Sequence, residues 1–175
     1  MLFRSVVTRC SNNYGPYQFP EKFIPLMIAQ AMVGERLPVY GKGSNVRDWI
    51  HVCDHCTALD AVLQRGREGE VYNIGGGCEK RNLEVAKLIL ATLGRSESLI
   101  QFVSDRKGHD LRYAINCEKL ERELGWRPEV AFDQGLERTI AWYRGNVAWL
   151  DDVRTGQYRD YFQKHYVQRE KTFAP

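Results

Sequence analysis

The sequence predicts an α/β protein, because apolar segments of strand length alternate with longer segments of helical periodicity. The first strand-then-helix unit runs from the apolar segment 3–8 through a polar turn to a helix that begins between Pro20 and Pro25. A second unit joins the segment 70–74 to a helix through Gly75-Gly-Gly77. Parallel strands need such crossover helices, so we expect an α/β layer with helices packed on a sheet.

The elements between these units carry separate signals. The first helix has apolar residues at helical spacing and is expected to stop at Gly34. Strands are expected at 37–40 and 46–52, separated by a glycine-containing turn. Asp54 is expected to cap a helix that continues to about Gln64. The predicted apolar side of that helix consists of Ala58, Leu59, Val62 and Leu63.

The second half of the chain continues the alternation. Strands are expected at 99–103 and 111–115, on either side of a polar loop. Three further helices are expected, each with an amide or carboxylate side chain as its N-terminal cap: Asn82, Asn116 and Asp133.

Length and composition limit the class of protein. A chain of 175 residues with 43% hydrophobic content can bury one core, so one globular unit is expected. The net charge of +3 comes from interspersed charges, without a basic stripe or a helix-turn-helix pattern, which argues against nucleic-acid binding. No apolar run approaches the roughly 20 residues of a membrane-spanning helix. We therefore expect a cytoplasmic protein that acts away from membranes.

Five cysteines, at positions 10, 53, 56, 78 and 117, are too few and too scattered for a disulfide framework, so reduced thiols are expected. The cluster His51-Val-Cys-Asp-His-Cys56 contains good zinc ligands. Because no second Cys/His pair stands at a finger-like spacing, we interpret these thiols as packed or helix-surface groups and expect no metal site.

Six motifs together resemble one enzyme family. They occur in that family's order and at similar intervals, and they cover nearly everything from Val6 to about Tyr166. The motifs are Arg9-Cys-Ser-Asn-Asn-Tyr-Gly-Pro-Tyr17, Pro20-Glu-Lys-Phe-Ile-Pro25, Val39-Tyr-Gly-Lys-Gly43, Arg47-Asp-Trp-Ile-His51, Tyr72-Asn-Ile-Gly-Gly76 and Gly108-His-Asp110. The chain resembles the carboxyl-terminal half of the dTDP-glucose 4,6-dehydratases, NAD-dependent enzymes of the extended short-chain dehydrogenase family.

The resemblance implies a remnant of a Rossmann-type parallel sheet, its last strands and helices, together with a small α/β substrate-binding domain. The Rossmann-type segments would be about 3–15 and 46–78. The nucleotide-sugar-binding lobe would be about 16–45 and 79–150, interleaved with them in one unit of 1–175 and followed by an aromatic and charged tail, 151–175.

Two parts of a complete enzyme of this family are missing from the sequence. A dinucleotide-binding turn needs three spaced glycines, and after Gly75-Gly-Gly77 the third would fall at Lys80, so that run is interpreted as a structural turn. In the family, a lysine stands four residues after the catalytic tyrosine. No tyrosine of this sequence has a lysine at that spacing. No catalytic residue is therefore assigned, and the chain alone is expected to be inactive.

The resemblance assigns binding roles residue by residue. Asn12 matches a contact to the sugar nucleotide and Asn13 a contact to the NAD cofactor. Arg47 matches a diphosphate ligand, which suits the guanidinium fork, and Arg106 is expected to be the second. Further substrate contacts are matched by Lys22, Phe23, Pro38, Val39, Tyr40, Asn82, Asp105, Lys107, Gly108 and His109.

Most of these residues also have a structural interpretation. The two asparagines suit a turn, Lys22 suits an exposed surface, and 38–40 suits an edge strand. Arg47 could pair with Asp48 or Glu35. Asn82 could serve only as a helix cap, and the segment 105–109 could be a charged hairpin loop.

In the intact family, NAD oxidises the sugar at C4, water leaves across C5 and C6, and the hydride returns to C6, so the enzyme is a lyase of deoxysugar and polysaccharide biosynthesis. The expected partner is a dTDP-sugar, and the family forms homodimers. Two alternatives stay open: a non-catalytic fragment that binds a nucleotide sugar or pairs with another subunit, and a sibling epimerase or decarboxylase.

The sequence departs from the family pattern at four positions. Cys53 replaces an acid, Cys56 replaces an alanine, Lys107 replaces a proline and Asn116 replaces an aspartate. None of the four is a proposed phosphate contact.

Overall fold

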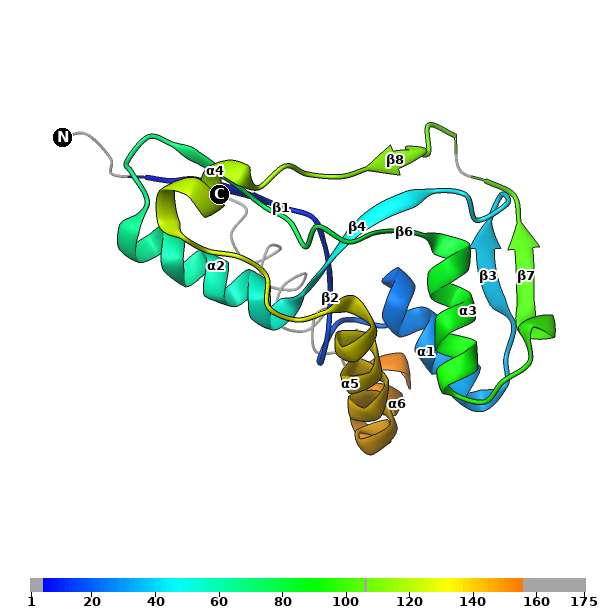
Figure 1. Cartoon of the computed structure of the whole chain (residues 1–175). Helices are drawn as coiled ribbons and strands as arrows, with labels where there is room; N and C mark the ends of the chain where they lie inside the picture. Colours follow the sequence, from blue (N-terminus) through cyan, green and yellow to red (C-terminus); the bar gives the residue numbers. More distant parts are fainter. Residues whose placement is uncertain (1–4, 106, 156–175) are drawn as a thin grey trace, which may run out of the picture.

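Strand β4 (Val46–His51) lies at the centre of the molecule and connects its two sides (Figure 1). The computed structural model describes residues 5–105 and 107–155. β4 pairs in parallel with β2 (Asn12–Tyr14) and β8 (Arg112–Tyr113), and antiparallel with β6 (Glu79–Arg81). This strand therefore carries the connections between segments that are far apart in the sequence.

Two parallel pairs complete the strand arrangement. β1 (Val7–Cys10) pairs with β5 (Val71–Ile74), and β3 (Leu37–Tyr40) pairs with β7 (Ile100–Val103). The predicted α/β class is confirmed, with parallel pairs joined through helices. The other expected strands appear, several of them shorter than predicted, but the first was misplaced: it was expected at 3–8, whereas β1 runs from Val7 to Cys10 into the predicted turn. Strands β2 and β6 were not expected.

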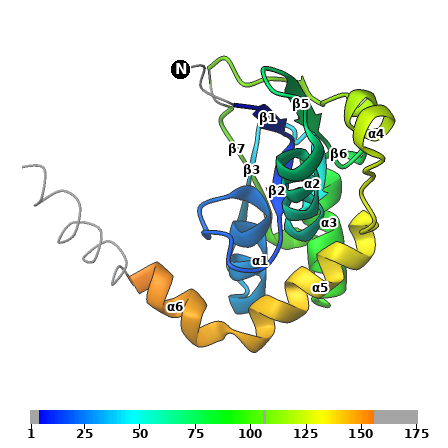
Figure 2. The same ribbon diagram turned by 90° about the vertical axis from the view of Figure 1, so that its left-hand side faces the viewer.

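The predicted helices are all present within the described residues. Gly34 and Gly125 adopt left-handed conformations at the ends of two of them, as expected for C-terminal glycines. The last helix runs outward from the helix before it (Figure 2), while its Leu150, 2% exposed, packs in the larger hydrophobic cluster. The helices are α1 (Phe23–Val33), α2 (Val52–Arg65), α3 (Asn82–Thr92), α4 (Glu118–Leu124), α5 (Phe132–Gly145) and α6 (Val147–Thr155), with a 3-10 turn at Glu97–Leu99.

The predicted N-terminal caps were wrong for α2, α3 and α5. The cap of α2 is His51, whose Nδ1 accepts the Cys53 N–H at 3.3 Å, whereas Asp54 is already the third helical residue. Asn82 and Asp133 likewise lie inside their helices. Asn116 does act on α4, because its Oδ1 accepts the Glu118 N–H at 2.8 Å. Propensity alone placed these caps. For α2 a tertiary contact explains the difference, because the Asp54 carboxylate accepts the Val130 N–H.

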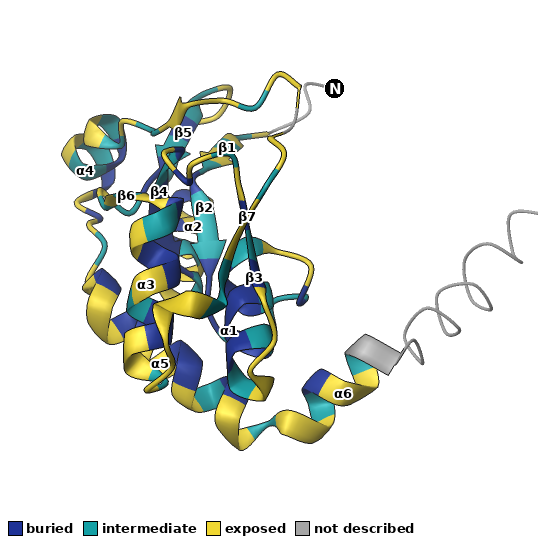
Figure 3. Ribbon diagram, turned by 90° about the vertical axis from the view of Figure 1, so that its right-hand side faces the viewer, coloured by how far each residue is buried: buried dark blue, intermediate teal, exposed yellow. Residues whose placement is uncertain are grey.

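The buried residues form two hydrophobic clusters, where the length of the chain had suggested one core (Figure 3). Trp49 belongs to the cluster between α1, α3 and α5, and its neighbour Ile50 belongs to the cluster between α2, β5 and α4. Successive side chains of a strand point to opposite faces, so β4 contributes to both clusters.

The buried side of α2 also differs from the prediction. It consists of Asp54, Ala58, Ala61 and Val62. Leu59 and Leu63, which were expected to face inward, are 39% and 85% exposed. The helix is rotated relative to its most apolar stripe because the Asp54 carboxylate is held inside the protein, where its Oδ2 accepts the Val130 N–H at 3.0 Å.

The glycine run after β5 packs against the main chain of β4. A Cβ at Gly76 would lie 1.9 Å from the Trp49 carbonyl oxygen, and one at Gly75 would lie 2.8 Å from Asp48 Oδ2. The Asp48 carboxylate is buried beneath this turn and accepts the Cys78 N–H at 2.9 Å. Burial raises the pKa of Asp48, and the bond from the Cys78 amide only partly offsets this.

Gly76→Ala is expected to destabilise the protein by about 3 kcal/mol or more, because backbone atoms of β4 cannot move aside for the added methyl group. Thermal unfolding followed by circular dichroism measures this. The matched control is Gly145→Ala at the end of α5, where a Cβ meets nothing within 4 Å. The control should be neutral or stabilising by up to about 1 kcal/mol. Equal stability of the two variants would contradict the close packing.

Asp48→Asn is expected to gain stability relative to the parent chain as pH rises from about 4 towards 7. The folded pKa of Asp48 is raised, so the folded state binds the proton more tightly, and ionisation above the unfolded pKa weakens folding. Glu79→Gln should behave in the opposite sense, because the hydrogen bond from Arg112 lowers the pKa of Glu79. Melting temperatures of the three proteins across this pH range test the pair, and parallel curves would refute the assignment.

Candidate nucleotide-sugar site

A cavity of about 340 Å³ opens between β2, β3, β4 and the first turns of α1 and α3. Its volume falls in the range of about 300–1,000 Å³ that is typical of small-molecule sites. Eight of the predicted substrate residues line it, and they come from five helices or strands and two loops. They are Asn12, Lys22, Phe23, Pro38, Tyr40, Arg47, Asn82 and His109; Glu21, Leu26, Met27 and Trp49 complete the lining.

Strand pairing explains why residues distant in sequence meet in this cavity. Asn12 of β2 stands opposite Trp49 of β4 in the parallel register. Arg47 lies two residues before Trp49 and therefore on the same face of the strand. The Phe23 ring, at the start of α1, stacks on Trp49 with centroids 6.1 Å apart and an interplanar angle of 28°. The rings of Phe23 and Trp49 thus form an aromatic wall of the cavity, and packing in the hydrophobic cluster holds them in place.

Asn82 combines a fixed backbone with an unsatisfied side chain. Its N–H donates to the Asn45 carbonyl at 3.0 Å, which fixes the start of α3 against the 41–45 turn. The residue is 9% exposed, and among the described residues its side-chain Oδ1 has no hydrogen-bond partner. A buried amide oxygen without a partner is costly, so this atom is available to a donor that enters the cavity.

The Arg47 guanidinium is oriented by main-chain carbonyl groups. It donates to the Val46 oxygen at 2.7 Å and to the Asp110 oxygen at 2.9 Å. These bonds hold a permanent positive charge at the wall of the cavity and connect it to the loop 104–110.

His109 brings that loop to the cavity. Its side chain is 5% exposed, and its Nδ1 lies 2.6 Å from Asp105 Oδ1. The His109 ring also meets Tyr40 edge-on, with centroids 6.0 Å apart. The Asp105 carboxylate therefore holds the His109 ring that lines the cavity.

Four of the described predicted substrate residues do not line this cavity: Val39, Asp105, Lys107 and Gly108. Val39 is fully buried and faces the core, as expected for a residue between Pro38 and Tyr40 on a strand. Lys107 and Gly108 are exposed in the loop, and Arg106 lies outside the described residues. Their assigned roles stay predictions.

Asn13 points away from the cavity, to the other face of β2. Its Nδ2 donates to the Ser11 carbonyl at 3.1 Å, and its Oδ1 lies 2.8 Å from His55 Nδ1. Burial lowers the pKa of His55, which favours a neutral ring beside the amide. The structure therefore separates Asn12 and Asn13 onto opposite sides of the sheet.

A family model described as GDP-mannose 4,6 dehydratase matches residues 2–139. The chain belongs to this family. A "dTDP-glucose 4,6-dehydratase" of Xanthomonas campestris is 52% identical over 163 residues, which are 88% of this chain and 46% of that protein. The relatives confirm the resemblance to the dTDP-glucose 4,6-dehydratases.

Solved structures give the same result. A dTDP-glucose 4,6-dehydratase of Bacillus anthracis in complex with NAD superposes with a TM-score of 0.81 at 56% identity, covering 85% of this chain and 47% of that one. The Streptomyces venezuelae enzyme, solved with NAD and TYD bound, gives 0.83 at 52% identity and covers 85% and 46%. The Rossmann-type character of the fold is confirmed, and the chain spans about half the length of these relatives.

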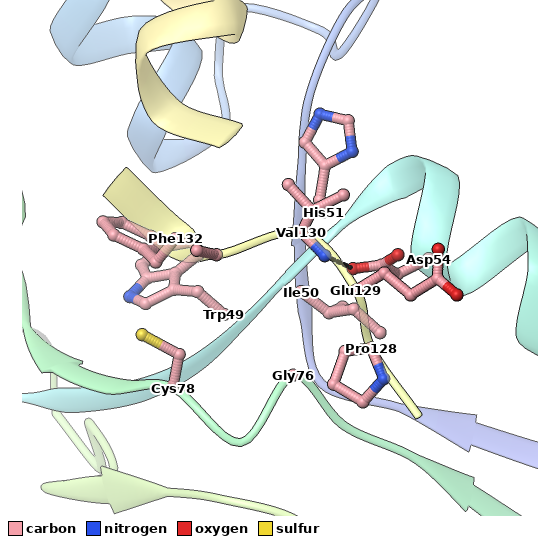
Figure 4. A pocket seen from close by; sticks show the side chains of 11 residues that line it. Trp49, Ile50, His51, Asp54, Gly76, Cys78, Pro128, Glu129, Val130 and Phe132 are labelled. Atoms are coloured by element: carbon pink, nitrogen blue, oxygen red, sulfur yellow. Dashed lines mark hydrogen bonds between the residues drawn. The ribbon is translucent and has the colours of Figure 1, made fainter. Parts of the chain in front are cut away.

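A second cavity, of about 310 Å³, lies between β4, the glycine run after β5 and the segment 128–132 (Figure 4). Figure 4 shows the Asp54 carboxylate bonded to the Val130 N–H at its edge. Burial lowers the pKa of His51 and raises the pKa of the Cys78 thiol, so neither is favoured in its charged form. No group of three or more metal-binding side chains occurs among the described residues.

Sequence reasoning missed the apolar part of the first cavity. Trp49 could have been found, because it lies at the i+2 position from Arg47 in a predicted strand. Leu26 could also have been found, one helical turn after Phe23. The same helical spacing applies to Met27, whereas Glu21 gave no separate signal in the sequence.

Proposed function

We propose that this chain forms the nucleotide-sugar-binding part of a dTDP-glucose 4,6-dehydratase. The observation that carries the proposal is the cavity between β2, β3 and β4, which gathers eight residues that the family resemblance had assigned to the substrate. These residues are dispersed from position 12 to position 109, so only the fold brings them together. The family membership of the chain and of its relatives supports the same assignment.

The lining offers a suitable partner for each part of such a ligand. Arg47 supplies a fixed guanidinium and Lys22 an ammonium group for a diphosphate. The amides of Asn12 and Asn82 can donate to and accept from sugar hydroxyl groups. Tyr40 offers a ring at the edge of the cavity for a planar base.

The residues present do not form a complete NAD site. Asp48 and the main chain of β4 fill the space beside Gly75 and Gly76. The glycine run therefore leaves no backbone cradle for a pyrophosphate. Asn13 alone matches a cofactor contact, on the opposite face of β2 from the cavity. We therefore assign NAD to the complete family enzyme and derive no catalytic step through it in these 175 residues.

The reaction proposed for the complete enzyme is the conversion of dTDP-glucose to the 4-keto-6-deoxy sugar nucleotide with loss of water. This chain binds and orients the substrate, and without the tyrosine–lysine pair it is expected to show no turnover by itself.

The compartment proposed is the cytoplasm, where the five free cysteines would stay reduced. A dimer with a second copy stays a prediction from the family. No helix among the described residues is long and apolar enough to span a membrane.

Arg47→Ala is expected to weaken binding of dTDP-glucose about tenfold to hundredfold, because one charge-assisted contact to phosphate contributes about 1.5–3 kcal/mol. Isothermal titration calorimetry on a sample with a cooperative thermal transition measures this. Arg122→Ala, at a 68% exposed position on α4, is the matched control and should bind as the parent chain does. A folded parent chain that binds no dTDP-glucose would refute the proposal, and equal loss in both variants would remove Arg47 from it.

A second candidate role, pairing with another polypeptide segment, is favoured by β1. Among the described residues β1 pairs only with β5, and an open groove of about 520 Å³ lies beside it. Leu63, 85% exposed, lines this groove from α2. An unpaired strand edge beside an open groove with exposed leucines suits the addition of further strands.

Leu63→Lys is expected to reduce self-association of the purified chain without changing its melting temperature, because the exposed leucine contributes little to the folded monomer. Sedimentation velocity over a concentration series measures the association. Leu111→Lys, at a 67% exposed position near β8, serves as the control. A parent chain that stays monomeric at all concentrations would contradict this role.

A further inference from the structure

Cys53 and Cys56 lie close together at the start of α2, outside both cavities. Cys53 is the second residue of the helix and Cys56 the fifth. Both are exposed and free. Asp54, between them, is turned inward to the Val130 N–H, so the helix presents the two cysteines on the side opposite to its buried face.

Their spacing suits a covalent link. Residues three apart in an α-helix have Cα atoms about 5 Å apart, within the roughly 4.4–6.8 Å that disulfides span. Their Cβ atoms are about 5–6 Å apart, so the turn must tighten by about 1 Å or more to reach disulfide geometry. The first turn of a helix can tighten in this way, because its N–H groups are not yet held by intrahelical bonds.

The surroundings leave this turn accessible. The Cys53 N–H is bonded to His51 Nδ1, on the inner side, and Thr57 Oγ1 donates to the Asp54 carbonyl at 2.9 Å. His55, between the two cysteines, points to Asn13 and not to either thiol. Cys-x-x-Cys at the beginning of a helix is the arrangement that exchanges disulfides in redox proteins.

We propose that Cys53 and Cys56 form a redox-active dithiol that closes to an intramolecular disulfide by exchange with a low-molecular-weight disulfide. One thiolate attacks the external disulfide and forms a mixed disulfide, and one external thiol leaves. The second cysteine then attacks the protein sulfur of that mixed disulfide and releases the second external thiol. Two protein thiols are oxidised by two electrons, the external disulfide is reduced, and both protons pass to the released thiols.

The experiment incubates the full chain with glutathione buffers of defined oxidised-to-reduced ratio, on samples with a cooperative thermal transition. Acid quenching, alkylation and intact mass spectrometry then count free thiols and bound glutathione. The expected product has lost two hydrogens, carries no glutathione and has two fewer alkylated cysteines. Peptide mapping should place the link between Cys53 and Cys56.

Two sets of variants make the result specific. Cys53→Ser and Cys56→Ser should each accumulate a mixed disulfide with glutathione on the remaining cysteine. The triple variant Cys10→Ser, Cys78→Ser, Cys117→Ser should still close. Serine at exposed positions 53 and 56 removes no core contact, and the melting temperature verifies that each variant is folded.

A second probe reports the reduced pair directly. Phenylarsine oxide, a trivalent arsenical that binds two neighbouring thiols, should bind one equivalent per chain with the parent and the triple variant. Loss of that equivalent in Cys53→Ser is expected. Independent glutathionylation of both cysteines without ring closure, or arsenical binding that survives Cys53→Ser, would overturn the proposal.

Discussion

The structure depends on β4 being hydrogen-bonded along both of its edges. β2 and β8 pair with it in parallel and β6 antiparallel, and the Trp49 N–H additionally donates to the Cys78 carbonyl at 3.0 Å. A slip of one residue in this register would exchange Trp49 and Ile50 between the two hydrophobic clusters. It would also turn Arg47 away from the cavity. The binding site and both cores are therefore consequences of one strand register.

Close packing over β4 maintains that register. Gly76 lies so near the Trp49 carbonyl that no side chain fits, and Asp48 below it is bonded to the Cys78 amide. Close packing against β4 thus explains why glycines stand here, without any role in nucleotide binding. The sequence of the glycine run resembles part of a dinucleotide fingerprint, but the spacing at Lys80 and the packing both argue against that use.

The fold class and most elements could be predicted from the sequence, because strand-length and helical periodicities were clear and Gly34 and Gly125 ended their helices. The cavity residues could be named only through the family resemblance, since an isolated Lys22 or Asn82 has no distinctive local signal. The cap of α2 was mispredicted because the Asp54 carboxylate is held by the Val130 N–H, and that of α3 because the Asn82 N–H is held by the Asn45 carbonyl; propensity contains neither contact. Strand β2 was missed because Asn12-Asn-Tyr14 has turn chemistry, and it is extended only through pairing with β4.

The double-edged pairing of β4 also sets an order of local opening. Between them, β2, β6 and β8 pair along its whole length, so its hydrogen-bonded amide protons should be among the slower-exchanging in the described chain. β1 is held by β5 alone within the described residues, and its amides should exchange through a smaller fluctuation. We therefore expect local opening to begin at β1, and the cavity wall formed by Arg47 and Trp49 to open later.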